Sequence, residues 1–293
     1  METLTTAFGD QIKKVMKTSK IPTVITEENV YQEGDPVILA ILDEMVSPLL
    51  LPGSGLTGLN NLEELLDKAQ SGKACLLLVE HYSNMDLSIV SLLSRMAGGR
   101  GKDISDSIIA IAGMKLNEDN PIVAAFTGAY TKIVICPSRT TQELDPEKDK
   151  AEILRANAIN RAAMKSLIRH KYKGKLVLVF PSGTRYRSWD PTSKKGVREI
   201  DSYIRSFDYM CFVALNGEIL HVQQTDMLND AVSKDIVRAT VGPVTSCDDF
   251  RNKILATLSE DDDKKQAVAD EIMNQLEKMH TKAEEDRQEL LKP

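Results

Sequence analysis

A histidine and an aspartate lie close together where an apolar run gives way to polar residues. His81 follows CLLLVE, and Asp86 comes five positions later, at the start of the next helical stretch. A turn between them can bring the carboxylate onto one imidazole nitrogen, which fixes the tautomer and makes the other nitrogen more basic. The pair therefore predicts a general base that takes a proton from a hydroxyl. The alternative is a surface histidine beside an ordinary acid in the first turn of a helix.

Two arginines follow another apolar run, in the segment KLVLVFPSGTRYR. Pro181, Ser182 and Gly183 form the supporting turn, and Arg185 and Arg187 follow it, two positions apart. Guanidinium groups present forked donors that match phosphate oxygens, so this pair can hold one phosphate group. The alternative is two arginines in ordinary surface ion pairs.

A third apolar run, KIVICP, is followed by Arg139. Parallel strands end at one edge of a sheet, and α/β proteins place their sites there. We therefore expect Arg139 and the arginine pair to share a cleft with His81 and Asp86. This combination predicts a general base beside a phosphate-binding site, whereas each feature alone is weak.

The elements that must position these residues are short apolar runs alternating with helical stretches, which is typical of an α/β fold. We expect a mixed, largely parallel sheet flanked by helices, with the clearest helices at 86–96 and 146–170. Helical periodicity before residue 71 predicts a smaller N-terminal helical domain at 1–71. The α/β domain then covers 72–293, with a charged helical tail from about residue 248. The predicted strands are 75–80, 107–113, 132–137, 175–181, 210–215 and 237–242.

Composition excludes several classes of protein. A hydrophobic fraction of 42% and a charged fraction of 27% are those of a globular protein. The net charge of −6 argues against a general nucleic-acid binder. The four cysteines form no close pair, which predicts a reducing compartment and no disulfide frame or zinc site. The N-terminus lacks the apolar core of a secretory signal, and the apolar runs are far shorter than the ~20 residues of a membrane-spanning helix. We therefore expect a soluble or peripheral protein.

Two segments leave a contact with membranes or partners open. The loop LLLPGSGL at 49–56 is either the edge of the core or a spot that touches a membrane. A cationic stretch docks an acidic carrier protein or anionic lipid headgroups, or else it is a solvated helix face. Its members are Arg155, Arg161, Lys165, Arg169, Lys171, Lys173 and Lys175.

Three blocks of the sequence resemble the glycerolipid acyltransferases, and among them the soluble glycerol-3-phosphate acyltransferases of plastids and some bacteria. The blocks are LEELLDKAQSGKACLLLVEHYSNMDLSIVSLL, IAGMKLNEDNPIVAAFTGAYTKIVICPSR and FPSGTRYRSWDP. Ser182 stands where membrane-bound relatives usually carry Glu. The resemblance covers about residues 30 to 215. Two residues depart from the usual pattern: Glu80 replaces the Asn that commonly precedes the histidine, and Leu87 replaces a Pro.

This resemblance implies the roles of the residues. His81 corresponds to the catalytic base and Asp86 to its partner. Arg185 and Arg187 fall on the arginines that contact the acceptor phosphate, and Arg139 falls near further basic residues. The implied reaction moves a fatty acyl group from acyl-carrier protein or acyl-CoA to the 1-hydroxyl of glycerol 3-phosphate. No cofactor or metal is expected, and the implied location is the bacterial cytoplasm or the plastid stroma, with peripheral membrane contact left open.

Two alternatives stay open. One is transfer to 1-acylglycerol 3-phosphate, although such enzymes usually have a hydrophobic N-terminal anchor that this sequence lacks. The other is a lipid- or phosphate-binding regulatory protein that kept the fold without catalysis. A serine hydrolase is disfavoured because the sequence contains no Gly-x-Ser-x-Gly.

Overall fold

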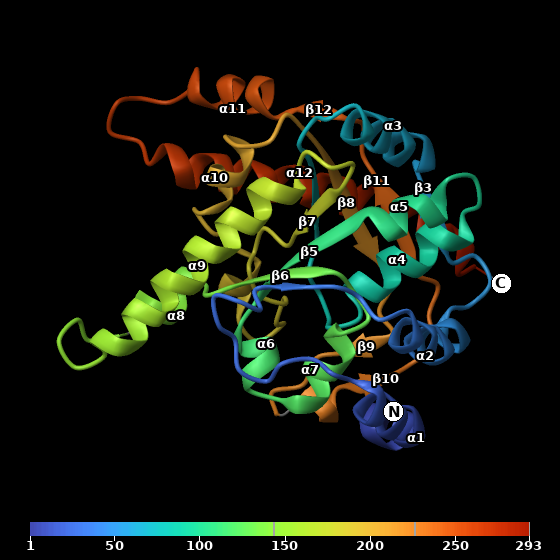
Figure 1. Ribbon diagram of the computed structural model, residues 1–293. Helices are drawn as coiled ribbons and strands as arrows, with labels where there is room; N and C mark the ends of the chain where they lie inside the picture. Colours follow the sequence, from blue (N-terminus) through green and yellow to red (C-terminus); the bar gives the residue numbers. More distant parts are fainter. Residues whose placement is uncertain (143, 226, 293) are drawn as a thin grey trace.

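A mixed β-sheet between two layers of helices forms the body of the molecule (Figure 1). The computed structural model describes residues 1–142, 144–225 and 227–292. In these residues the sheet has the order β2-β6-β5-β7-β4-β8-β11-β3, and β12 pairs with β8. The strands are β2 (Tyr31–Gln32), β3 (Gly55–Thr57), β4 (Cys75–Val79), β5 (Ile108–Gly113), β6 (Lys132–Ile135), β7 (Leu176–Val179), β8 (Tyr209–Asn216), β11 (Arg238–Val241) and β12 (Thr245–Ser246).

The five central strands, from β6 to β8, run parallel to one another. The outer strands β2 and β11 are antiparallel to their inner neighbours, and β3 is parallel to β11. A small second sheet joins β1 (Glu2–Thr3), β10 (Ala231–Val232) and β9 (Leu220–His221). The predicted fold class is confirmed, and a strand lies at each of the six predicted runs.

Both faces of the sheet are covered by helices, which explains why the central strands are largely apolar. Along β4, Cys75, Leu77 and Val79 enter one core, whereas Leu76 and Leu78 enter the other. The first core contains residues of α1 (Leu4–Thr18), α2 (Pro36–Val46), α3 (Leu59–Gln70), α4 (Asp86–Met96), α5 (Gly101–Ser107) and α7 (Pro121–Thr127). The second contains residues of α9 (Lys150–His170), α10 (Ile200–Ile204), α11 (Cys247–Leu255) and α12 (Lys264–Leu290). The short helical elements are η1 (Ser47–Leu49), α6 (Lys115–Glu118), α8 (Ser138–Gln142), η2 (Pro191–Lys194) and η3 (Met227–Asn229).

A separate N-terminal helical domain is not confirmed. Residues 1–71 contribute β2 and β3 to the large sheet and β1 to the small one. Leu4, Val15 and Leu42 lie in the same core as strand β4. The N-terminal region is therefore continuous with the α/β body through both backbone pairing and side-chain packing.

The leucine-rich loop packs inward. Leu49 and Leu50 lie against the first core, and the backbone N–H of Leu51 donates to the carbonyl of Asp235 at 2.9 Å. These contacts favour the core interpretation of this loop. No helix in the described part of the chain combines the length and apolar character needed to cross a membrane.

Candidate active site

Asp86 is anchored by four donors at the turn between β4 and α4. Its Oδ2 accepts the backbone N–H groups of Tyr82 at 2.6 Å and Ser83 at 2.9 Å, and lies 2.8 Å from Nδ1 of His81. Its Oδ1 accepts the Ser83 hydroxyl at 2.9 Å. The side chain is only 3% exposed. Because the turn wraps around this carboxylate, the local sequence itself brings His81 and Asp86 together.

His81 is held on two further sides. Its ring stacks on Phe180 with the centroids 4.0 Å apart, and its carbonyl accepts the backbone N–H of Tyr186 at 2.7 Å. An ionised carboxylate can only accept, so Nδ1 carries a proton, and in the neutral form of the ring the lone pair is on Nε2. The side chain is 17% exposed and lines a small cleft. This geometry suits a base that takes a proton from a group in the cleft.

The segment that carries the arginines reaches His81 because β7 is the neighbour of β4. Leu78 pairs with Val179 at the ends of these strands, so the loops that follow start side by side. Gly183 has a φ of 61°, a left-handed conformation that costs glycine little. Pro181 and Ser182 before it are buried, and the Ser182 hydroxyl donates to the carbonyl of Thr184 at 2.6 Å. The predicted turn is therefore present and directs the following residues toward His81.

Arg185 forms an ion pair that the sequence did not predict. Its Nη1 lies 3.1 Å from Oδ2 of Asp230, a carboxylate that is 1% exposed, and the arginine itself is 15% exposed. Burial lowers the pKa of Arg185, and the nearby Asp230 carboxylate opposes this shift. Arg185 also feels the charges of Arg187 and Asp86. Asp230 therefore holds the Arg185 guanidinium in place and offsets its charge, on the loop that Tyr186 joins to His81.

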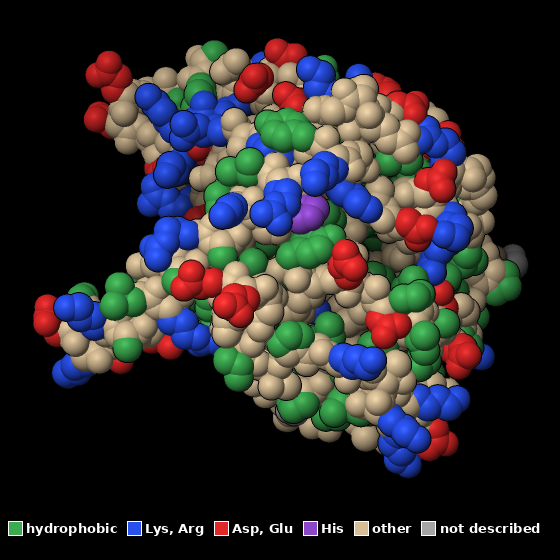
Figure 2. Space-filling view, in the orientation of Figure 1, with side chains coloured by type: hydrophobic (Ala, Val, Ile, Leu, Met, Phe, Trp, Pro, Cys, Tyr) green, Lys and Arg blue, Asp and Glu red, His purple; other side chains and the backbone are tan. Residues whose placement is uncertain are grey.

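Neither Arg139 nor Arg187 forms an ion pair with a carboxylate in the part of the chain that the structure describes. Arg139, in α8 after β6, donates from Nη2 to the carbonyl of Gly183, which joins the loops after β6 and β7. The backbone N–H of Arg187 donates to the Ser193 hydroxyl at 2.8 Å. In Figure 2, Lys and Arg side chains lie above and beside a histidine near the middle of the visible face, and hydrophobic side chains lie below it. Arg185 and Arg187 lie on the loop that Tyr186 joins to His81, and Arg139 of α8 contacts the same loop through Gly183.

A second histidine–carboxylate pair involves Glu80, the residue before His81. His280 of α12 places Nδ1 2.9 Å from Oε2 of Glu80, and the Tyr82 hydroxyl donates to Oε1 of Glu80 at 3.0 Å. Glu80 also accepts the backbone N–H of Leu215 at 2.8 Å and is 6% exposed. Burial alone would lower the pKa of His280, but the hydrogen bond and charge of Glu80 outweigh it and raise that pKa. Glu80 thus has a specific partner on α12.

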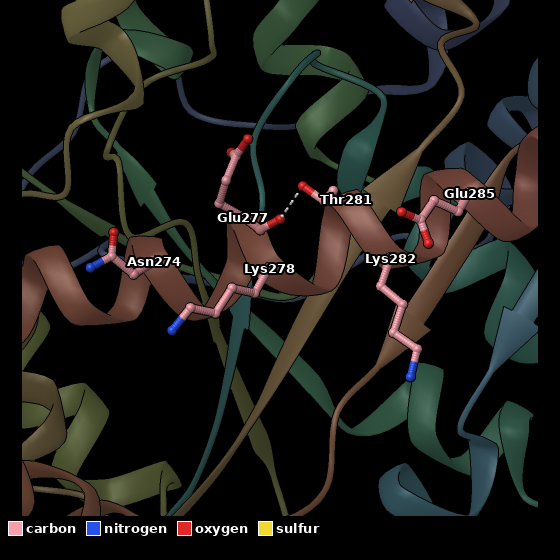
Figure 3. A pocket seen from close by; sticks show the side chains of 6 residues that line it. All are labelled: Asn274, Glu277, Lys278, Thr281, Lys282 and Glu285. Atoms are coloured by element: carbon pink, nitrogen blue, oxygen red, sulfur yellow. Dashed lines mark hydrogen bonds between the residues drawn. The ribbon is translucent and has the colours of Figure 1, made fainter.

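Helix α12 closes one side of the cleft with Met273 and Glu277. Glu277 pairs with Lys194 of η2 at 3.0 Å, so the helix and the loop after β7 are tied together. Figure 3 shows Glu277 leaving α12 on a different side from Lys278 and Lys282. The cleft is lined by Glu80, His81, Tyr82, Ser182, Tyr186, Ser193, Lys194, Met273 and Glu277.

Sequence reasoning missed His280, Asp230 and the α12 side chains. Nothing in the sequence indicated that Glu80 has a partner 200 positions away. Asp230 lies in a segment without any recognisable motif. No protein-family model matches this chain, and no curated protein matches it at a significant level.

Proposed function

We propose that this protein is an acyltransferase that moves a fatty acyl group from a thioester, on acyl-carrier protein or CoA, to the 1-hydroxyl of glycerol 3-phosphate. The product is lysophosphatidic acid. One observation carries the proposal: a histidine backed by a buried aspartate lies on a turn that is hydrogen-bonded to the loop bearing Arg185 and Arg187. The resemblance of the three sequence blocks supplies the reaction class.

The histidine would act as general base. Nε2 of His81 removes the proton of the acceptor hydroxyl as its oxygen attacks the thioester carbonyl. The carbon–oxygen bond forms, the carbon–sulfur bond breaks, and the imidazolium returns its proton to the leaving thiolate. Asp86 stabilises the imidazolium between these steps and holds its ring in one tautomer. No covalent intermediate on the protein is needed.

The arginines would orient the acceptor by its phosphate. Arg139 and Arg187 have no carboxylate partner among the described residues, so they supply the net positive charge that a dianion requires. Arg185 is already paired with Asp230, and it would provide directed donors from a fixed position. Binding of the phosphate at one end of glycerol 3-phosphate would direct the hydroxyl at its other end toward His81.

The test is thiol release from an acyl thioester by the purified protein, with glycerol 3-phosphate, with 1-acylglycerol 3-phosphate and without acceptor. We expect release that depends on glycerol 3-phosphate and falls by about 10²- to 10⁴-fold in His81→Ala. Arg187→Ala should mainly raise the KM for the acceptor, because it contacts a group that does not react. His170→Ala is the matched control, since that ring stacks on Tyr31 instead. Undiminished turnover in His81→Ala contradicts the proposal, and a preference for the acylated acceptor favours the alternative enzyme.

A further inference from the structure

Helix α9 carries apolar side chains on two opposite sides. Its inner side packs against the sheet through Ala156, Ile159, Ala163 and Leu167. Its outer side presents large apolar side chains to solvent, three of them at four-residue spacing and one ten residues earlier on the same side. They are Leu154 (60% exposed), Met164 (51%), Ile168 (55%) and, just beyond the helix, Tyr172 (50%). Exposed apolar side chains in such an arrangement form a surface that a membrane or another protein can cover.

The predicted cationic stretch divides into two groups in the structure. Arg155 pairs with Glu118 and Glu152, Lys171 donates to the carbonyl of Ser206, and Lys175 donates to that of Asp106. The contacts of these three basic residues therefore lie within the folded chain. The remaining four are exposed, and no carboxylate in the described part of the chain pairs with them. They are Arg161, Lys165, Arg169 and Lys173.

The four unpaired cations lie among and beside the apolar residues of the same outer side. Arg161 and Lys165 lie between Leu154 and Ile168 along the stripe, and Arg169 follows at its edge. The single acid of α9, Glu152, lies in its first turn and is engaged by Arg155. The outer side of α9 therefore combines apolar and positive side chains without an intervening negative charge, although the whole chain carries −6.

We propose that this outer side of α9 docks on an anionic lipid surface. Leu, Met, Ile and Tyr side chains enter the boundary of the acyl chains, while Lys and Arg reach the phosphates of the headgroups. From Leu154 to Tyr172 the stripe spans about 27 Å at the rise of an α-helix, and the N-terminal part of α9 projects from the body (Figure 1). A flat lipid surface can follow such a line, whereas an acidic protein would need an apolar groove of the same length. This inference does not depend on the proposed acyl transfer.

The test is flotation of the full chain with vesicles of phosphatidylcholine alone or mixed with phosphatidylglycerol. We expect partition onto the mixed vesicles only, weakening as salt is raised. Lys165→Glu with Arg169→Glu should lower the partition coefficient by about 25-fold or more, from about fivefold for each lost cation. Met164→Ser with Ile168→Ser should also lower it, because apolar insertion is lost.

Lys278→Glu with Lys282→Glu provides the matched control. These exposed lysines lie on the outer side of α12 beside Glu285, on a surface of mixed charge (Figure 3). The double change there alters the net charge of the protein by the same amount as Lys165→Glu with Arg169→Glu. The proposal is supported if this control variant still floats with the mixed vesicles while the α9 variants no longer do. Three results would overturn it: no flotation of the full chain, equal loss in the control, or binding of an acidic acyl-carrier protein through Lys165 and Arg169 without vesicle binding. Melting curves of the variants confirm that each is folded.

Discussion

Replacing Asp86 should separate its structural role from its charge. In Asp86→Ala, the two backbone N–H groups of Tyr82 and Ser83 lose their acceptor inside a turn from which water is largely excluded. Each buried donor left unpaired costs about 1–3 kcal/mol, so the free energy of unfolding should fall by about 2–6 kcal/mol. That is a large share of the roughly 5–15 kcal/mol that stabilises an ordinary protein.

Asp86→Asn should cost much less. The amide oxygen can occupy the position of Oδ2, which accepts three of the four hydrogen bonds, and the amide nitrogen can donate to the Ser83 hydroxyl oxygen. We expect a loss of about 1 kcal/mol. At about 2 °C per kcal/mol for a chain of this size, melting followed by circular dichroism should drop by about 4–12 °C for Ala and about 2 °C for Asn. Equal melting temperatures for the two variants would refute the claim that the carboxylate organises the turn, whatever reaction the protein catalyses.

Two further predictions concern pH. Lys132 is 2% exposed and donates to the Thr127 hydroxyl at 2.7 Å, and burial lowers its pKa to about 7. The folded protein thus binds fewer protons than the unfolded chain between pH 7 and 10.5, so stability should rise with pH there, by on the order of 4 kcal/mol. Lys132→Met should lack this rise and melt higher at pH 7, and an unchanged pH dependence of melting between pH 7 and 10 would contradict the assignment. The raised pKa of His280 has the opposite effect: its ion pair with Glu80 is fully present below about pH 6.5 and is lost as pH rises through the folded pKa. His280→Gln should therefore destabilise the protein more at pH 5.5 than at pH 8.5, and an equal loss at both values would show that the pair contributes no charge interaction.

The sequence alone predicted those features that depend on neighbours along the chain. The central strands were recognisable because both of their faces are buried, which leaves continuous apolar runs such as 75–79 and 176–179. The contact of His81 with Asp86 is equally local, since one turn of backbone wraps the carboxylate. The turn at Gly183 belongs to the same class.

Tertiary structure decided the features that depend on the path of the chain. The strand order places β7 beside β4, and only this order joins Tyr186 to His81. Asp230 meets Arg185 from 45 positions away, and His280 meets Glu80 from 200 away. The N-terminal strands β2 and β3 are two and three residues long and are held by backbone pairing. Such short segments show no alternation of apolar and polar side chains from which a strand could be predicted. Local patterns determine which segments form strands and helices, whereas burial and hydrogen bonding between distant segments determine which polar groups finally meet.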